Sequence, residues 1–138
     1  MRTSWLFGRA GRCFPAIILR LAAERDQLTV VNDQVGAPTF TGHLARALLE
    51  LAPARLPGIV HVAGDGECSW FEFARAVLAH ARVQTEIRPG STRELNGPAP
   101  RPAYSVLRSE RREAPRLRHW RQGLGDFFAA GVASACGC

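Results

Sequence analysis

The chain has 138 residues, a length that fits one domain or part of a larger one. Its 46% hydrophobic and 22% charged composition is that of an ordinary globular protein, and its apolar runs are too short to cross a membrane, so no membrane partner is expected. The net charge of +6 reflects eighteen arginines, and the chain has no lysine. The densest arginine cluster is interleaved with Glu110 and Glu113 and has no aromatic side chains on which bases could stack, so no nucleic-acid partner is expected either.

In the first half of the chain, strands are expected to alternate with helices. The predicted elements are a strand at residues 2–8, a helix that begins at Phe14, a strand at 28–31, a loop at 32–39 and a helix that Thr41 caps and that ends near Pro53. The first helix is predicted because apolar residues recur at i, i+3, i+4 and i+7 from Phe14, and because Pro15 suits a first helical turn.

The second half continues this alternation. A strand is predicted at 58–64, and because it is apolar throughout it is expected to be covered on both faces. Ser69 and Glu72 have the spacing of a capping box, which predicts a helix start there. The remaining predictions are a strand at 84–87, an irregular proline-rich segment at 97–102, a helix at about 120–128 and a disordered tail at 131–138.

The alternation of strands and helices predicts an α/β fold. The chain begins directly in a strand, and the strands near Thr3 and Ile59 have the pattern of interior members of a sheet. We therefore expect that other members of this sheet are missing, and that the chain is a truncated part of a longer protein.

The sequence lacks the residues for several kinds of catalysis. It holds one tyrosine, Tyr104, and no lysine, so a Tyr-Lys proton-transfer pair is impossible and no catalytic residue is expected in this chain. The glycines at 8 and 11, and at 64 and 66, only partly match a dinucleotide fingerprint and are interpreted as turns, so no cofactor-binding residue is expected.

The four histidines are scattered, and His61 is interpreted as a satisfied core histidine. The four cysteines, Cys13, Cys68, Cys136 and Cys138, have neither zinc nor redox spacing. No metal is therefore expected. Incidental thiols favour a cytoplasmic location.

Four stretches together, in order and spacing, resemble the dTDP-4-dehydrorhamnose reductase family of extended short-chain reductases. They are Arg-Thr-Ser-Trp-Leu-Phe-Gly at 2–8, Asp-Gln-Val-Gly-Ala-Pro-Thr at 33–39, residues 58–64 with Glu-Cys-Ser-Trp-Phe-Glu-Phe-Ala at 67–74, and Pro-Ala-Pro-Arg-Pro-Ala-Tyr-Ser-Val-Leu at 98–107. The resemblance implies a C-terminal part, with two strands of the Rossmann sheet plus a small α/β substrate-binding domain. Residues 1–130 would bind the sugar nucleotide, and the N-terminal dinucleotide-binding domain would be absent.

By this resemblance, the whole enzyme reduces dTDP-4-dehydro-L-rhamnose to dTDP-L-rhamnose with NADPH or NADH. The isolated chain is expected to be inactive and to hold no cofactor, its partners being a dTDP-sugar nucleotide and the missing N-terminal half, with a homodimer left open. Two alternatives remain: a related nucleotide-sugar reductase or epimerase, and a non-catalytic regulatory subunit of the same fold, like the one that regulates methionine adenosyltransferase.

Five residues are candidates for substrate binding. The resemblance assigns Trp5 to the bound deoxysugar nucleotide, and an indole does offer a flat apolar face and an N–H donor, although packing beneath the strand is the alternative. Gln34, Pro38 and Thr39 lie on the loop that resembles the cleft-lining loop of the family, where a purely structural role is as reasonable. Arg101 suits a diphosphate, or else a structural salt bridge.

Overall fold

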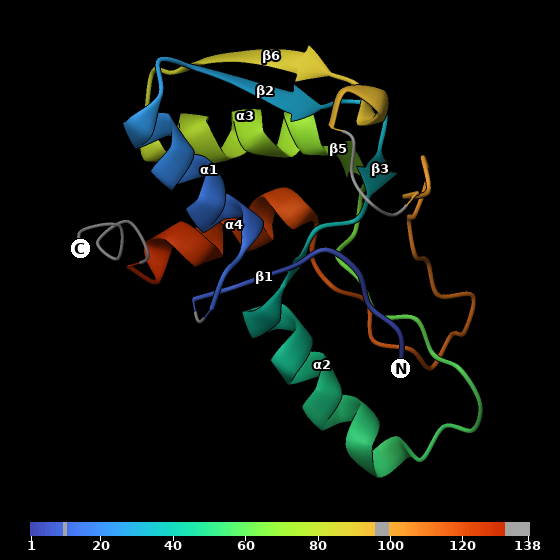
Figure 1. The fold of residues 1–138 in the computed structure, drawn as a ribbon. Helices are drawn as coiled ribbons and strands as arrows, with labels where there is room; N and C mark the ends of the chain where they lie inside the picture. The colour runs from blue at the N-terminus through green and yellow to red at the C-terminus, as the bar shows by residue number, and fades with distance from the viewer. Residues whose placement is uncertain (10, 96–99, 132–138) are drawn as a thin grey trace.

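The computed structural model describes residues 1–9, 11–95 and 100–131 (Figure 1). In chain order its elements are β1 (Leu6–Phe7), α1 (Phe14–Glu24), β2 (Gln27–Val31), β3 (Val35–Gly36), β4 (Thr39–Phe40), α2 (Thr41–Ala54), β5 (Cys68–Ser69), α3 (Trp70–Ala81), β6 (Glu86–Gly90), the 3-10 helix η1 (Thr92–Leu95) and α4 (Trp120–Ala129). The expected tail at 131–138 lies outside the described residues except for Gly131, as does much of the proline segment.

One part of the molecule is a small layered α/β unit. β2 and β6 pair in parallel from Gln27 with Glu86 to Val31 with Gly90. Figure 1 shows this pair above α1 and α3, with α4 below them. The main core lies between these layers, because α1, α3 and α4 direct apolar side chains such as Ile18, Phe73 and Phe127 into it. Burial of this apolar surface is the principal force that holds the layers together.

The second part is built around β1. It pairs in parallel with β4, and Arg2 forms an isolated parallel bridge with His61. The helix α2 packs here with a separate hydrophobic cluster, of which Leu44, Val60 and Val62 are buried members. The α/β class is thereby confirmed.

Residues 58–64 do not form the doubly covered strand expected from their composition. Only His61 of this segment makes a β-bridge, and burial alternates: Val60 and Val62 are 5% and 1% exposed, whereas Ile59 is 55% exposed. Alternation is the pattern of an extended segment covered on one face only, here by α2. The expectation of two covered faces was wrong for this structure.

Helix starts were predicted with mixed success. The capping box at Ser69 and Glu72 is confirmed, because each side chain accepts a hydrogen bond from the other residue's backbone N–H. Thr41, by contrast, is the first residue of α2, and the N-cap is Phe40 without any side-chain hydrogen bond. α2 ends at Ala54, one residue after Pro53, as expected. The expected strand at 84–87 is displaced to Glu86–Gly90, where β2 supplies its partner.

None of the helices in the described part of the chain is long and apolar enough to span a membrane.

Candidate substrate-binding site

A cavity of about 400 Å³ opens between α1 and β2. This volume lies within the usual range for small-molecule sites. One wall is apolar and comes from α1 and from β2, and Gln34, Trp70 and Arg101 add polar and aromatic groups. The lining residues are Phe14, Ile17, Ile18, Leu21, Arg25, Leu28, Thr29, Val30, Val31, Gln34, Trp70 and Arg101.

Trp5 and Trp70 form a face-to-face stack beside this cavity. Their ring centroids are 3.5 Å apart and their planes differ by 6°. Trp5 has a left-handed backbone conformation, with φ at 45°, which turns the chain at this point. Phe14 of α1 continues the aromatic row, with its ring centroid 4.5 Å from that of Trp70. The row joins the residue before β1 and the first residues of α1 and α3, and α3 is far from the other two segments in the sequence.

Gln34 is fixed by hydrogen bonds at both ends of its amide. Its Oε1 accepts from Nε1 of Trp70 at 3.2 Å, and its Nε2 donates to Oγ1 of Thr92 at 2.9 Å. Thr92 in turn donates to Asp33, and this hydrogen bonding lowers the pKa of the Asp33 carboxyl. Gln34 is only 6% exposed, so these bonds satisfy a buried amide and set its orientation at the cavity wall.

The five candidate residues from the sequence occupy different positions relative to the cavity. Gln34 and the exposed Arg101 lie on its wall. Trp5 stacks on Trp70 and is not among the residues that line the cavity. Pro38 and Thr39 are buried, and Oγ1 of Thr39 donates to the Ala37 carbonyl and accepts from the Gly64 amide, which holds the loop in place. Their assignment to substrate binding stays a prediction.

Sequence reasoning did not single out Trp70 or Phe14, both of which line the cavity. The signal that was available is the position of Trp70 directly after the capping residue Ser69. A side chain in the first turn of a helix lies at its end, where loops and neighbouring elements meet.

Three of the four glycines that partly match a dinucleotide fingerprint, Gly8, Gly64 and Gly66, are closely packed. A phosphate cradle needs glycines whose backbone is open to the ligand. A Cβ on Gly64 would lie 2.1 Å from the Pro38 carbonyl oxygen, and one on Gly66 would lie 2.3 Å from Nε2 of His119. Gly8 is likewise packed against Thr41. Gly8, Gly64 and Gly66 permit close internal packing, in keeping with their interpretation as turns.

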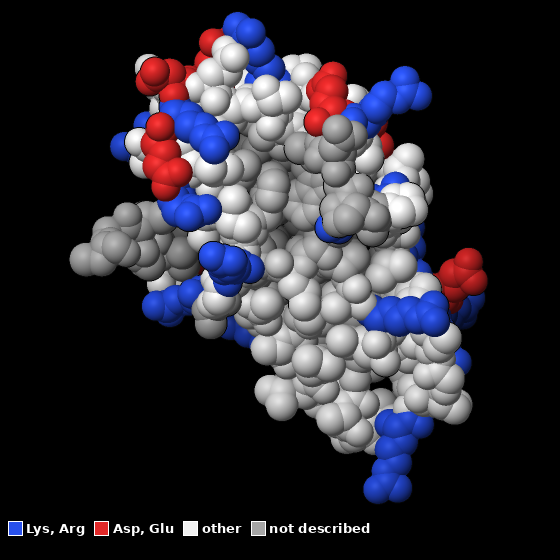
Figure 2. Space-filling model, in the orientation of Figure 1, with Lys and Arg blue, Asp and Glu red and all other residues white. Residues whose placement is uncertain are grey.

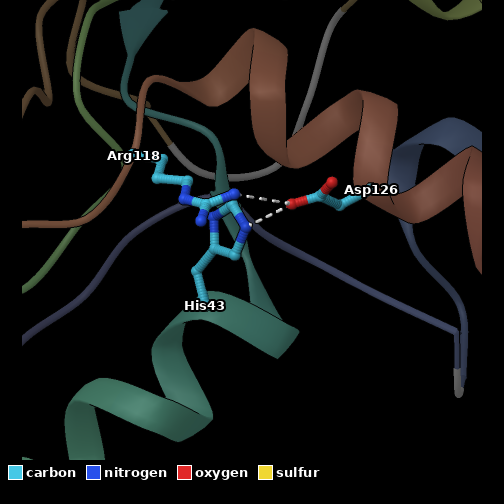
Figure 3. A network of polar contacts seen from close by, with 3 residues as sticks. All are labelled: His43, Arg118 and Asp126. Atoms are coloured by element: carbon cyan, nitrogen blue, oxygen red, sulfur yellow. Dashed lines mark hydrogen bonds and ion pairs between the residues drawn. The ribbon is translucent and has the colours of Figure 1, made fainter.

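A second polar cluster lies away from the cavity. Figure 3 shows His43 and Arg118 pointing toward Asp126 of α4. Nε2 of His43 is 2.7 Å from Oδ2 of Asp126, and Nη1 of Arg118 is 3.8 Å from the same oxygen. The side chains of Asp126 and Arg118 are 46% and 64% exposed. The cluster connects α2 to α4 and is explained as a structural contact.

Known proteins similar to this chain are longer than it. The protein of Bacillus subtilis (strain 168) described as spore coat polysaccharide biosynthesis protein SpsK is 42% identical over 99% of this chain and 48% of its own length. The dTDP-4-dehydrorhamnose reductase of Mycobacterium tuberculosis (strain ATCC 25618 / H37Rv) is 40% identical over 94% of this chain and 45% of its own length. The chain therefore spans about half the length of the curated relatives it matches.

The fold agrees with this similarity. The crystal structure of dTDP-4-dehydrorhamnose reductase from Bacillus anthracis str. Ames in complex with NADP superimposes with a TM-score of 0.89 and 36% identity, over 94% of this chain and 47% of that one. The family model described as RmlD substrate binding domain matches residues 1–132. The chain belongs to the RmlD substrate binding domain family.

Proposed function

We propose that this chain is the sugar-nucleotide-binding half of a dTDP-4-dehydrorhamnose reductase. The observation that carries the proposal is the match, over 94% of the chain at 40% identity, to a protein of that name. The cavity between α1 and β2 supports it, since it combines an apolar wall with the amide of Gln34 and the guanidinium of Arg101. Such a mixture suits a nucleotide sugar, which has a planar base and a diphosphate.

The whole protein would transfer a hydride from NADPH or NADH to C4 of dTDP-4-dehydro-L-rhamnose and a proton to the carbonyl oxygen. Both the cofactor and the proton donor would belong to the other half. The solved relative in complex with NADP supports the choice of a nicotinamide cofactor. This chain has one tyrosine and no lysine, so alone it would not catalyse the reduction.

Within the proposed site, the five candidates have different tasks. Arg101 would pair with the diphosphate, and Gln34 would present the remaining hydrogen-bonding capacity of its amide to the ligand. Pro38 and Thr39 are buried and would hold the loop in its conformation. Trp5 would form part of the aromatic wall through its contact with Trp70.

The other half of the reductase would dock on the segments around β1. Leu6 and Ile59 are 48% and 55% exposed, although both are large apolar side chains on the segments that pair around β1. On the face drawn in Figure 2, a broad area without charged side chains extends over β1 toward α2. Exposed apolar surface of this kind marks an interaction site. A homodimer that uses the same surface is the competing arrangement.

The test is complementation. The chain is produced alone, and also together with the amino-terminal half of a full-length reductase from this family, and NADPH oxidation is measured with dTDP-4-dehydro-L-rhamnose. We expect no turnover from either part alone and turnover from the two together. Turnover by the isolated chain would contradict the assignment. A complex that binds dTDP-sugar without turnover would favour the regulatory-subunit alternative.

A related nucleotide-sugar reductase is the second candidate. SpsK, at 42% identity, is described by its part in making spore coat polysaccharide and not by its sugar. Competition of dTDP-, UDP- and GDP-sugars for the complemented protein would identify the nucleotide, and turnover of different dTDP-4-keto sugars would identify the sugar. We also propose that the protein acts in the cytoplasm, since Cys13 and Cys68 are free thiols.

A further inference from the structure

We propose that the edge of residues 61–63 that faces away from Arg2 binds an extended, acidic peptide segment of a partner protein, which adds a strand to this edge. The site lies at a second cavity, and within the described residues this cavity shares no lining residue with the one between α1 and β2. Its ligand would be a protein segment and not a sugar nucleotide, so the site goes beyond the proposed function.

The extended segment that follows α2 is already paired along the edge that faces Arg2. The Val62 N–H donates to the Arg2 carbonyl at 2.9 Å, and the Arg2 N–H donates to the Val60 carbonyl at 2.7 Å. Backbone groups of successive residues in an extended chain point to opposite edges. The N–H and C=O groups of His61 and Ala63 therefore point away from Arg2.

On that second edge, pairing occurs only at Asp65. Its N–H donates to the Arg118 carbonyl at 3.2 Å, and its carbonyl accepts from the Trp120 N–H at 2.9 Å. Within the part of the chain that the structure describes, no backbone group pairs with His61 or Ala63 on this side. Unpaired N–H and C=O groups along a strand edge are a template for a further strand.

A cavity of about 330 Å³ lies beside these unpaired groups. In Figure 1, the green segment after α2 and the orange segment before α4 run side by side here. Two contacts hold the walls of the cavity: Nδ1 of His61 lies 3.2 Å from the Arg108 carbonyl oxygen, and Leu117 packs against the cluster that includes Leu44 of α2. The lining residues come from segments 61–66, 106–109 and 115–117.

The charges around this cavity favour an acidic ligand. Arg108 and Arg116 line it, and the guanidinium of Arg111 lies beside the start of the same extended segment. Asp65 is the acidic residue in the described lining, and it lies at the end where the edge is already paired. Arg108 is also 3.7 Å from Glu67, but both side chains are exposed, so this ion pair contributes little and leaves Arg108 available.

A peptide fits the unpaired edge better than a small anion does. A phosphate would accept from the N–H groups of His61 and Ala63, but it would also face their carbonyl oxygens, which repel it. An extended peptide supplies donors and acceptors in alternation and satisfies both kinds of group. Its carboxylate side chains would then form charge-assisted hydrogen bonds with the arginines around the cavity.

The experiment measures binding of fluorescein-labelled peptides to the 138-residue chain by fluorescence anisotropy. The probe is the extended acidic peptide Glu-Val-Thr-Val-Glu, capped at its carboxyl end. Its controls are the basic peptide Lys-Val-Thr-Val-Lys and a copy of the acidic peptide in which every peptide nitrogen is methylated. We expect the acidic peptide to bind at least about tenfold more tightly than either control, because the controls lose the charge match or the backbone hydrogen bonds.

Two variants test the backbone and the charges separately. Ala63→Pro removes an N–H that points into the cavity, and it should abolish peptide binding while the chain stays folded, since proline is tolerated at an unpaired edge. Arg116→Glu should weaken binding of the acidic peptide roughly tenfold and strengthen that of the basic one. Arg75→Ala is the control, because Arg75 lies over Phe71 and outside this cavity, so the affinity should not change. Circular dichroism checks that each variant is folded.

Several outcomes would overturn this assignment. Equal affinity for the acidic, basic and methylated peptides would do so, as would absence of binding by all three. Binding of inorganic phosphate that Arg116→Glu abolishes, without peptide binding, would indicate an anion site instead. Peptide binding that is lost when the amino-terminal half is added would show that this half covers the edge. A dimer that Ala63→Pro dissociates would show that a second copy of the chain covers it.

Discussion

Oδ2 of Asp126 lies 2.7 Å from Nε2 of His43, and this contact connects α4 to α2 (Figure 3). The His43 side chain is only 10% exposed there, whereas that of Asp126 is 46% exposed. The two helices contribute to different hydrophobic clusters, with Leu124 of α4 in one and Leu44 of α2 in the other. The hydrogen bond therefore helps to hold the two parts of the chain in one arrangement.

Replacement of Asp126 by Ala should lower the free energy of unfolding by about 1 kcal/mol, the usual net value of one hydrogen bond. Urea denaturation followed by circular dichroism measures this change. Arg118→Ala is the control, because Arg118 is 64% exposed and 3.8 Å from the carboxylate, and such a pair contributes about 0–0.5 kcal/mol. Equal losses of unfolding free energy in the two variants would mean that the stabilisation comes from the ion pair between Arg118 and Asp126, and not from the contact between His43 and Asp126.

Removal of the capping hydroxyl at Ser69 should also be measurable. Oγ of Ser69 accepts from the Glu72 amide at 3.1 Å and donates to Oδ1 of Asn32 at 2.7 Å. Ser69→Ala should therefore lower the free energy of unfolding by about 1–2 kcal/mol. Thr41→Ala should change it by less than about 0.5 kcal/mol, because Thr41 makes no capping hydrogen bond in α2. A large loss at Thr41 would contradict the structure and restore the sequence-based expectation.

Local rules explain why part of the fold was predictable. The capping box at Ser69, the proline in the first turn of α1 and the apolar spacing from Phe14 each depend on neighbours within one or two helical turns. The family followed from four such stretches in order. The exposure of Ile59 was not predictable, because it depends on which faces of the segment other elements cover.

The candidate site shows the same limit more clearly. Trp5 and Trp70 are separated by most of the first half of the chain, and no local pattern indicates that their rings stack. Gln34 was found because it lies in a recognisable loop motif. Its bonds to Trp70 and Thr92 arise only from tertiary contacts. Residue type and motif therefore identified the loop. The ring contacts and hydrogen bonds that its residues make could be seen only in the structure.

Two glycines of α4 offer a matched pair of substitutions. A Cβ on Gly125 would meet nothing closer than 3.9 Å, so Gly125→Ala should raise the free energy of unfolding by about 0.5–1 kcal/mol through helix propensity. A Cβ on Gly123 would lie 2.9 Å from Cβ of Phe40, and Gly123→Ala should lower it by about 1–3 kcal/mol. Thermal unfolding measures whether each substitution raises or lowers the stability of the chain. Stabilisation by both variants would show that α4 packs less tightly on Phe40 than described.

Tyr104 allows a pH-dependent test with a single chromophore, because it is the one tyrosine in the sequence. Its hydroxyl donates to Oε2 of Glu67 at 2.6 Å, and this hydrogen bond, with the nearby negative charge, raises the pKa of the phenol above its ordinary value of 10.0. Absorbance titration of tyrosinate should show a raised midpoint in the folded chain. Glu67→Ala should return the midpoint toward the ordinary value.

The sign of the accompanying stability change follows from the raised pKa. The protonated phenol is the form that donates to Glu67, so its stabilising contribution is complete below the ordinary pKa of 10.0 and is lost as the pH rises through the folded value. Arg108→Ala should move the midpoint further upward, because Arg108 favours the tyrosinate. A midpoint that is the same in the original chain and in the Glu67→Ala variant would show that the Tyr104–Glu67 hydrogen bond does not form in solution.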